Sequence, residues 1–351
     1  MKVKIFAYLM FVLTLLAPLA SHAQSGFAGL GQDIAGFTQP QKDMPWSFPK
    51  DHGAHPDYRI EWWYVTANLK DDKGRDYGVQ WTLFRSALRP ETTIGWNDPQ
   101  IWMGHAALTT ATQHFTSERF ARGGIGVAGA VASPFETWID EWALRGNSDF
   151  SQLSLNGGGT DFAYDLTLAT NRPLIFHGDN GYSVKSEGGQ ASRYYSQPHF
   201  EVTGDLVFSD RQVSVSGTAW LDREYSSQPL APDQQGWDWF SIHLDDGAKV
   251  MLFRLRGTDN FYSGTWIAPD GQTTSLDASE IVLSTQRTAK VAGRSIPLDW
   301  DLKLPNKNVD ITIQPLNDQA WMDGRFSYWE GPILVNGTHS GRGYLEMTGY
   351  E

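Results

Sequence analysis

From Ile60 to the C-terminus, the chain contains repeated segments in which apolar and polar side chains alternate. Residues 60–69 (IEWWYVTANL) are rich in β-branched and aromatic side chains, a polar turn follows at 70–75, and residues 77–85 (YGVQWTLFR) resume the pattern. Short runs of this kind, bounded by turn residues, are typical of β-strands joined in hairpins. No stretch offers three helical turns with caps, so the sequence predicts an all-β fold.

Further segments carry the same pattern and are separated by Asp-Gly turns at 246–247 and 270–271. We expect strands at residues 101–110, 212–225, 237–244, 249–256, 261–267, 309–314 and 343–350. Residues 24–50 contain Gly, Gln, Pro and Asp without periodicity, which predicts an extended lead-in over the surface.

One hairpin pattern occurs twice, about 170 residues apart. Trp63-Tyr64 precedes an Asp-Asp turn and then Leu83-Phe84-Arg85, and Trp239-Phe240 precedes a second Asp-Asp turn and then Leu252-Phe253-Arg254. The chain has 351 residues, which is long for one domain at ~150 residues each. We therefore expect two similar β units, at 51–210 and 211–351, although hairpins of like composition also arise by chance.

The N-terminal residues have the three parts of a secretory signal peptide. Lys2 and Lys4 precede an apolar run, and Ser21-His22-Ala23 provides a small-x-small end. We expect residues 1–23 to be cleaved after Ala23, which would leave a periplasmic or secreted protein without stable membrane insertion. The alternative is a retained membrane anchor, for which the run is short.

Composition excludes several classes of function. The sequence has no Cys, so it can form neither a disulfide framework nor a thiolate metal site. A net charge of -12 argues against a nucleic-acid partner, because such binding needs a basic face. His52 and His55 could ligate a metal, but no second cluster of ligands accompanies them. The G-x-G-x-x-G match at 124–129 lies among turns rather than before a helix, which argues against a dinucleotide site. We expect neither a metal nor another cofactor.

The densest group of chemistry-bearing residues is GTAWLDREY at 217–225. In a strand, Trp220, Asp222 and Glu224 share one face, with successive side chains ~7 Å apart. Paired carboxylates at that separation can divide acid and base roles when their environments differ. The alternative is a solvated acidic face, which would bury Arg223 on the other side.

Glu61 and His105 are further candidate catalytic residues. Glu61 shares a strand face with Trp63, and an aromatic enclosure there would raise the pKa of its carboxyl. A position in water at the end of the strand is the alternative for Glu61, and a hydrogen-bonded core histidine is the alternative for His105. The aromatic residues expected to bind substrate are Trp62, Trp63, Tyr64, Tyr195, Trp220, Trp237 and Trp239.

Five motifs give the chain a resemblance to a known family. They are PDYRIEWWY at 56–64, the strand at 217–225, GWDWF at 236–240, YWEG at 328–331 and GYLEMTGY at 343–350. Together they resemble the AttH/carotenoid 1,2-hydratase-type lipocalin-like proteins, above all the exported members labelled secreted hydrolases. The resemblance runs from about Asp51 to the end and implies two consecutive lipocalin-like antiparallel β-barrels.

The resemblance also implies a chemistry. Carotenoid hydratases add water to an isolated alkene without a cofactor, and Trp220-Leu221-Asp222 matches their aromatic-x-Asp pair. Their upstream His-x-Trp pair has no counterpart at residues 193–196 (RYYS), which places carotenoid hydration itself in doubt. We expect hydratase- or hydrolase-like acid–base chemistry on a small hydrophobic, isoprenoid- or lipid-like partner. The alternatives are a non-catalytic lipocalin-type binder and a carbohydrate-active enzyme or binding module.

Overall fold

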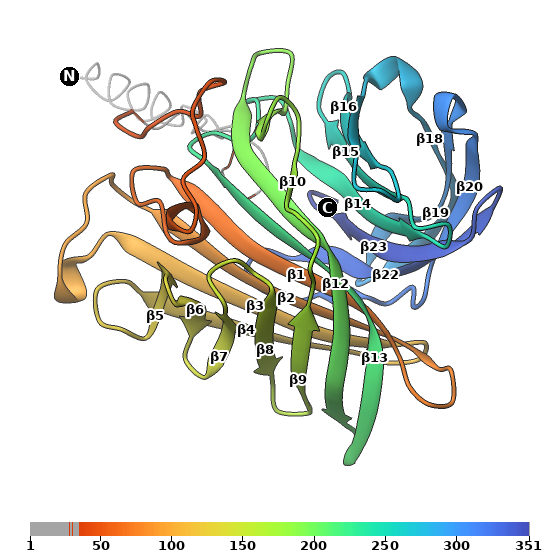
Figure 1. The fold of residues 1–351 in the computed structure, drawn as a ribbon, viewed down its shortest axis with the longest axis horizontal. Helices are drawn as coiled ribbons and strands as arrows, with labels where there is room; N and C mark the ends of the chain where they lie inside the picture. The colour runs from red at the N-terminus through yellow and green to blue at the C-terminus, as the bar shows by residue number, and fades with distance from the viewer. Residues whose placement is uncertain (1–27, 29, 31–34, 351) are drawn as a thin grey trace, which may run out of the picture.

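A computed structural model describes residues 28, 30 and 35–350 of the chain (Figure 1). The expected signal peptide at residues 1–23 lies outside the described residues. The described part of the lead-in runs over one end of the first sheet, where the Trp46 indole donates a hydrogen bond to the Asn180 carbonyl at 2.9 Å. Among the described residues, none of the helical segments is long and apolar enough to cross a membrane.

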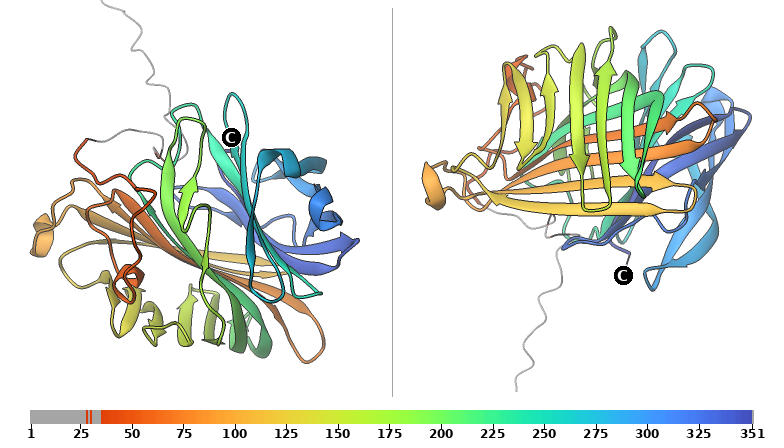
Figure 2. Two further views of the ribbon diagram at one scale, coloured as in Figure 1. Left: turned by 45° about the horizontal axis from the view of Figure 1, so that its top comes forward. Right: turned by 90° about the horizontal axis from the view of Figure 1, so that it is seen from below.

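The structure is all-β, as predicted, and consists of two curled antiparallel sheets (Figures 1 and 2). The first is a nearly closed barrel and the second a half-barrel. Only short 3-10 turns interrupt the strands in the described part: η2 (Lys50–His52), η3 (Gly95–Asn97), η4 (Ala278–Glu280) and η5 (Pro305–Lys307).

The first sheet has the strand order β4-β3-β2-β1-β13-β12-β9-β8-β7-β6-β5, with β10 and β11 attached to β12. Its strands are β1 (Ile60–Lys70), β2 (Asp76–Ala87), β3 (Gln100–Thr110), β4 (His114–Arg122), β5 (Ala128–Ala132), β6 (Phe135–Ile139), β7 (Trp142–Gly146), β8 (Gln152–Gly158), β9 (Phe162–Ala169), β10 (Ile175–Phe176), β11 (Tyr182–Val184), β12 (Ala191–Phe208) and β13 (Arg211–Ser226).

The second sheet has the order β17-β16-β15-β14-β23-β22-β20-β19-β18, with β21 attached to β22. Its strands are β14 (Gly236–Leu244), β15 (Lys249–Arg256), β16 (Phe261–Ile267), β17 (Thr273–Leu276), β18 (Val282–Val291), β19 (Arg294–Leu304), β20 (Val309–Pro315), β21 (Trp321–Met322), β22 (Tyr328–Gly337) and β23 (Gly341–Met347).

The two sheets repeat one connectivity. In each, the first strand (β1 or β14) lies beside the last strand (β13 or β23), and the hairpins that follow the first strand continue outward in sequence order. The two hairpins with the repeated sequence pattern, β1–β2 and β14–β15, hold the same place in this arrangement. The second sheet is therefore a smaller copy of the first.

The division between the sheets falls later in the chain than residues 210/211. Residues 216–226 of β13 pair with β1, and residues 211–225 pair with β12, so β13 completes the first sheet. A strand belongs to the sheet that satisfies its backbone hydrogen bonds, and this pairing is a long-range contact that local pattern does not reveal. The sheets are divided between Ser226 and Gly236.

Among the described residues, three large apolar clusters and one small one, around Met322, form the core. One fills the interior of the first sheet around Trp63 and Leu221, and a second fills the inner face of the second sheet around Phe240. The third lies between the sheets and includes Tyr64 and Trp220. Strand alternation explains this division, because neighbouring residues of β1 and β13 point to opposite sides of the first sheet.

Candidate functional site

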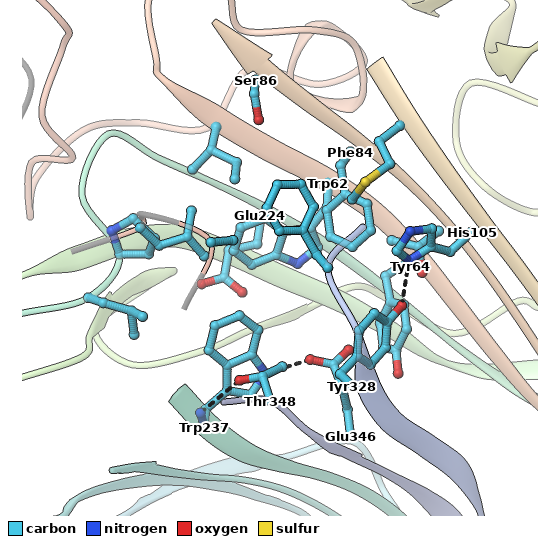
Figure 3. Close-up of a pocket in the computed structure, with 18 of the residues that line it drawn as sticks. Trp62, Tyr64, Phe84, Ser86, His105, Glu224, Trp237, Tyr328, Glu346 and Thr348 are labelled. Carbon is cyan, nitrogen blue, oxygen red and sulfur yellow. Dashed lines mark hydrogen bonds between the residues drawn. The ribbon is translucent and has the colours of Figure 1, made fainter. Parts of the chain in front are cut away.

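A mostly apolar cavity of about 660 Å³ lies between the two sheets (Figure 3). Strands β1, β2, β3 and β13 contribute to one side of it, and β14, β15, β22 and β23 to the other. Its aromatic lining residues are Trp62, Tyr64, Phe84, Phe120, Trp237, Trp239, Phe253, Phe326 and Tyr328. Cavities of this size and character are typical of sites for small ligands.

The cavity brings together most of the residues selected from the sequence. Those that line it are Trp62, Tyr64, His105, Asp222, Glu224, Trp237 and Trp239. Trp220 does not line the cavity but contacts a residue that does, since its indole donates a hydrogen bond to the Asp222 carboxyl at 2.6 Å. Glu61, Trp63 and Tyr195 lie on the opposite faces of their strands, inside the first sheet, and do not line this cavity.

Glu61 forms a buried ion cluster. Its carboxylate accepts hydrogen bonds from the guanidinium groups of Arg85 and Arg223, and all three side chains are at most 1% exposed. Burial opposes ionisation, but the two arginines outweigh it and hold the pKa of Glu61 well below its usual value. The expectation that an aromatic enclosure would raise this pKa is wrong, because both cations point to the same side of the sheet as Glu61.

Asp222 is a buried carboxyl that faces the cavity. Its Oδ1 accepts hydrogen bonds from the Ser196 hydroxyl and the Trp220 indole, and its Oδ2 accepts one from the Tyr194 hydroxyl at 2.7 Å. Burial raises the pKa of Asp222 to about 7, although these three donors act in the opposite direction. A carboxyl in this condition can hold or release a proton near neutral pH.

Ser196 extends this arrangement to His177, a residue that sequence reasoning missed. The His177 Nε2 atom lies 2.6 Å from the Ser196 hydroxyl, and its Nδ1 lies 2.9 Å from the Thr265 hydroxyl of the second sheet. Burial first, and Lys185 second, hold the pKa of His177 well below its usual value. The neutral ring therefore orients Ser196 toward Asp222.

Glu224 lies two residues beyond Asp222 on the same face but has different partners. Its Oε1 forms an ion pair with the Lys185 ammonium at 3.0 Å and accepts a hydrogen bond from the Ser192 hydroxyl. Burial lowers the pKa of Lys185, and Glu224 opposes that shift. The Lys185 ammonium also lies 3.9 Å from the centre of the Phe253 ring. The expected pair of acids thus contains one carboxyl near neutral titration and one held in an ion pair.

A second carboxyl with a raised pKa, Glu346, comes from the second sheet. It lines the cavity, and its Oε1 accepts a hydrogen bond from the Trp237 indole at 2.5 Å (Figure 3). Burial raises the pKa of Glu346 to about 7, and the charges of Asp222 and Glu224 act in the same direction. Sequence reasoning missed Glu346, although Tyr344-Leu345-Glu346 repeats the aromatic-Leu-acid order of Trp220-Leu221-Asp222.

The strand registers show that Glu224 and Glu346 hold equivalent positions. Glu224 lies opposite Trp62 in the β1–β13 pair, and Glu346 lies opposite Trp239 in the β14–β23 pair. Trp62 and Trp239 are matching residues of the duplicated hairpin, because they lie opposite Phe84 and Phe253, the central residues of the two Leu-Phe-Arg runs. The cavity therefore lies where the two copies face each other.

Glu330 is a buried carboxyl beside Glu346, although it does not itself line the cavity. It lies directly opposite Glu346 in the β22–β23 pair and accepts a hydrogen bond from the Tyr64 hydroxyl. Burial, and then the nearby charge of Glu346, raise the pKa of Glu330 well above its usual value. This residue was part of a motif in the sequence, but nothing local distinguished it from an exposed strand carboxylate.

His105 is fully buried and connects the cavity to the edge of the first sheet. Its Nδ1 lies 2.8 Å from the Tyr328 hydroxyl (Figure 3), and its Nε2 lies 3.1 Å from Glu118 Oε1. In the described part of the chain, no group of three or more His, Asp or Glu side chains is placed to hold a metal ion. His52 and His55 contact Tyr195 and Glu61 instead.

Comparisons with known proteins place this architecture in a family. The model of the family described as AttH-like matches residues 39–350. The chain belongs to the AttH-like family. No curated protein matches it.

Solved structures show the same fold. A Nitrosomonas europaea protein assigned as an AttH shares 32% identity with a TM-score of 0.80, over 90% of this chain and 100% of that one. Kievitone hydratase from Nectria haematococca shares 14% identity with a TM-score of 0.69, over 89% of this chain and 95% of that one. CghA, solved with Sch210972, shares 12% identity with a TM-score of 0.52, over 84% and 89% of the two chains. The last two comparisons concern the fold alone.

Proposed function

We propose that this AttH-like protein is an acid–base enzyme that adds water to a carbon–carbon double bond of a small hydrophobic molecule. The observation that carries the proposal is the pair Asp222 and Glu346, two carboxyls whose pKa values are both raised to about 7 and which line the same mostly apolar cavity. Because each charge disfavours the other, one carboxyl keeps its proton while the other ionises. That is the division of roles that a hydration needs.

Asp222 is the proposed general acid. It donates its proton to one alkene carbon, which leaves a carbocation at the other carbon and a carboxylate at Asp222. Trp62, Trp237 and Trp239 line the cavity. A Trp ring whose face meets the cation can stabilise it by ~2 kcal/mol or more when water is excluded. Water then attacks the cation and gives its proton to ionised Glu346.

Glu224 is less suited than Glu346 to the role of base. Its charge is matched by the Lys185 ammonium at 3.0 Å, so taking up a proton would leave a buried cation without its partner. The structural similarity to kievitone hydratase supports hydration over other acid–base reactions, since that protein is named for such an activity. The apolar lining favours an isoprenoid- or lipid-like substrate over a carbohydrate.

A labelled-water experiment tests this function. The purified protein is incubated with a panel of isoprenoid and unsaturated-lipid alkenes in ¹⁸O-water, and products are analysed by mass spectrometry. We expect at least one alkene to gain one labelled water, and Asp222→Asn to lower that rate by ~100-fold or more. Tight binding of the same alkenes, measured by quenching of Trp fluorescence, with no product from any of them, would favour the non-catalytic binder.

We also propose that the protein is exported, on the basis of the tripartite N-terminus at residues 1–23. N-terminal sequencing of protein recovered from the extracytoplasmic fraction should begin at Gln24. Recovery there of protein with an intact Met1 would contradict cleavage.

A further inference from the structure

Lys185 is a buried side chain that lines the cavity but has no part in the proposed transfer of protons. It follows β11 directly and belongs to the turn that leads into β12. Its backbone N–H donates a hydrogen bond to the Gln190 carbonyl at 2.7 Å, and the Gln234 side chain donates one to its carbonyl at 2.8 Å. These two bonds hold in place the backbone from which the side chain reaches the cavity.

The Lys185 ammonium lies against aromatic rings of both sheets. It is 3.9 Å from the centre of the Phe253 ring on β15 and 4.8 Å from that of the Tyr194 ring on β12. Ring faces attract a cation, and the attraction is stronger where water is excluded. The two faces therefore favour a cation at this position, but they provide no oxygen or nitrogen acceptor for its N–H groups.

The Lys185 ammonium also has more donors than the protein satisfies. Glu224 Oε1 lies 3.0 Å away, and the Nζ atom forms no hydrogen bond with any other described residue. An ammonium has three N–H donors, and the uncharged amine has two. In either form, at least one N–H group lacks an acceptor at the wall of an apolar cavity. Burial of such a donor is unfavourable unless a bound molecule supplies the acceptor.

Glu224 provides an acceptor beside this donor. Its Oε1 is occupied by Lys185 and the Ser192 hydroxyl, whereas its Oε2 accepts no hydrogen bond from the described part of the chain. Figure 3 shows Glu224 among the aromatic side chains that line the cavity. One functional group matches an available donor next to an available acceptor. It is the hydroxyl, which accepts through its oxygen and donates its hydrogen.

The charges of the site argue against an anionic group at this place. The charge of Lys185 is already matched by Glu224, and Asp222 and Glu346 add two carboxyls to the same lining. A carboxylate or phosphate brought into the cavity would be repelled by the ionised members of this set. A neutral hydroxyl would not be repelled.

We propose that Lys185 and Glu224 together bind a hydroxyl group of the substrate, so that the protein selects unsaturated alcohols over plain hydrocarbons and over unsaturated acids. The inference rests on the proposed function, because it names the class of alkene that the same cavity takes. The alcohol oxygen accepts a hydrogen bond from Lys185 Nζ, and the alcohol hydrogen is donated to Glu224 Oε2. The rest of the molecule occupies the aromatic part of the cavity, where Asp222 and Glu346 also lie.

Ligand binding tests this site without turnover. The probes are geraniol, its methyl ether, geranic acid, and the hydrocarbon in which hydrogen replaces the hydroxyl of geraniol. Their affinities are measured by quenching of Trp fluorescence. We expect Lys185→Met to weaken binding of geraniol by ~10-fold or more, as for the loss of one hydrogen bond to a charged group, without weakening that of the hydrocarbon. Wild-type protein should bind geraniol more tightly than the ether, which cannot donate to Glu224, and more tightly than geranic acid.

Two further variants complete the experiment. Because Lys185→Met leaves the buried charge of Glu224 without its partner, Lys185→Met/Glu224→Gln is measured as well, and it should lose the preference for geraniol over the hydrocarbon to the same extent. Lys290→Met makes the same change at an exposed position of β18 and should alter no affinity.

The outcomes separate the alcohol site from a merely structural ion pair. An unchanged ratio of the affinities for geraniol and the hydrocarbon in both Lys185 variants would overturn the alcohol site. Wild-type protein that binds the methyl ether as tightly as geraniol, or geranic acid more tightly, would overturn it too. A preference for geraniol that Lys185→Met abolishes, in a protein that hydrates no alkene, would uphold the alcohol site and count against the proposed function alone.

Discussion

The two sheets share one topology, but the acids with raised pKa values that they contribute to the cavity have different partners. In the first sheet, Asp222 receives hydrogen bonds from three side chains, whereas Glu346 in the second receives one, from Trp237. Both carboxyls nevertheless reach a pKa of about 7, because burial dominates at each. The comparison shows that two acids at different positions of the repeat, with different hydrogen-bond partners, reach a similar pKa because both are buried.

A second contrast lies on β1 and β14, on the faces of the two sheets that point away from the cavity. The first sheet holds Glu61 between Arg85 and Arg223, and the second holds Asp238 at 2.6 Å from Arg254 and 3.5 Å from Arg256. Both carboxylates are 0% exposed. The arginines of the first cluster are at most 1% exposed, but those of the second are 14% and 17% exposed. Only in the cluster of the second sheet can water therefore partly compensate the arginines for the loss of their carboxylate partner.

The largest expected effect follows from that contrast. Glu61→Gln should lower the free energy of unfolding by ~3–5 kcal/mol, because it leaves two buried guanidinium groups without their counter-charge. Asp238→Asn should cost clearly less, since Arg254 and Arg256 reach solvent. Urea unfolding of both variants measures the difference, and equal losses would show that the two clusters are equivalent.

The next prediction separates the roles of the two acids. For an active substrate, Asp222→Asn and Glu346→Gln should each lower kcat by ~100-fold or more, which corresponds to ~2.7 kcal/mol. The wild-type pH profile should be bell-shaped around neutrality. Asp222→Asn should remove its alkaline limb and Glu346→Gln its acidic limb. The opposite assignment of limbs would exchange the acid and the base.

Stability should also depend on pH through these two groups. Their pKa values rise from 3.8 and 4.5 to about 7 on folding, so between these values the folded state binds more protons than the unfolded state. The free energy of unfolding should therefore fall as pH rises toward 7, by ~1.4 kcal/mol per pH unit for each group. Asp222→Asn should lessen this slope in urea titrations, whereas Asp259→Asn, at an exposed position, should leave it unchanged.

The smallest effect concerns the hydrogen bonds to the acids. Trp237→Phe removes the indole donor that lowers the pKa of Glu346, so the acidic limb of the pH profile should move to higher pH by less than about one unit. Trp220→Phe should move the alkaline limb upward by less, because Asp222 keeps two other donors. Equal shifts in the two variants would show that donor number does not distinguish the acids.

Features that depend on consecutive residues could be predicted from the sequence. Alternation is a property of consecutive residues, so it predicted an all-β fold and placed Trp220, Asp222 and Glu224 on one face. The duplicated hairpin likewise predicted the repeat that the strand order confirms. The family resemblance, carried by motifs that recur in order, was confirmed by the family match.

Which groups meet depends on the three-dimensional fold. Glu346 and Lys185 lie far from Asp222 in the chain, and the fold brings all three to the lining of one cavity. The ionisation of Glu61 depends on Arg85 and Arg223. Strand register places the side chains of both arginines on the same face of the sheet as Glu61. Electrostatic surroundings are summed over neighbours in space, so a local pattern can indicate that a carboxyl is buried but not whether it will be paired with a cation or left to hold its proton.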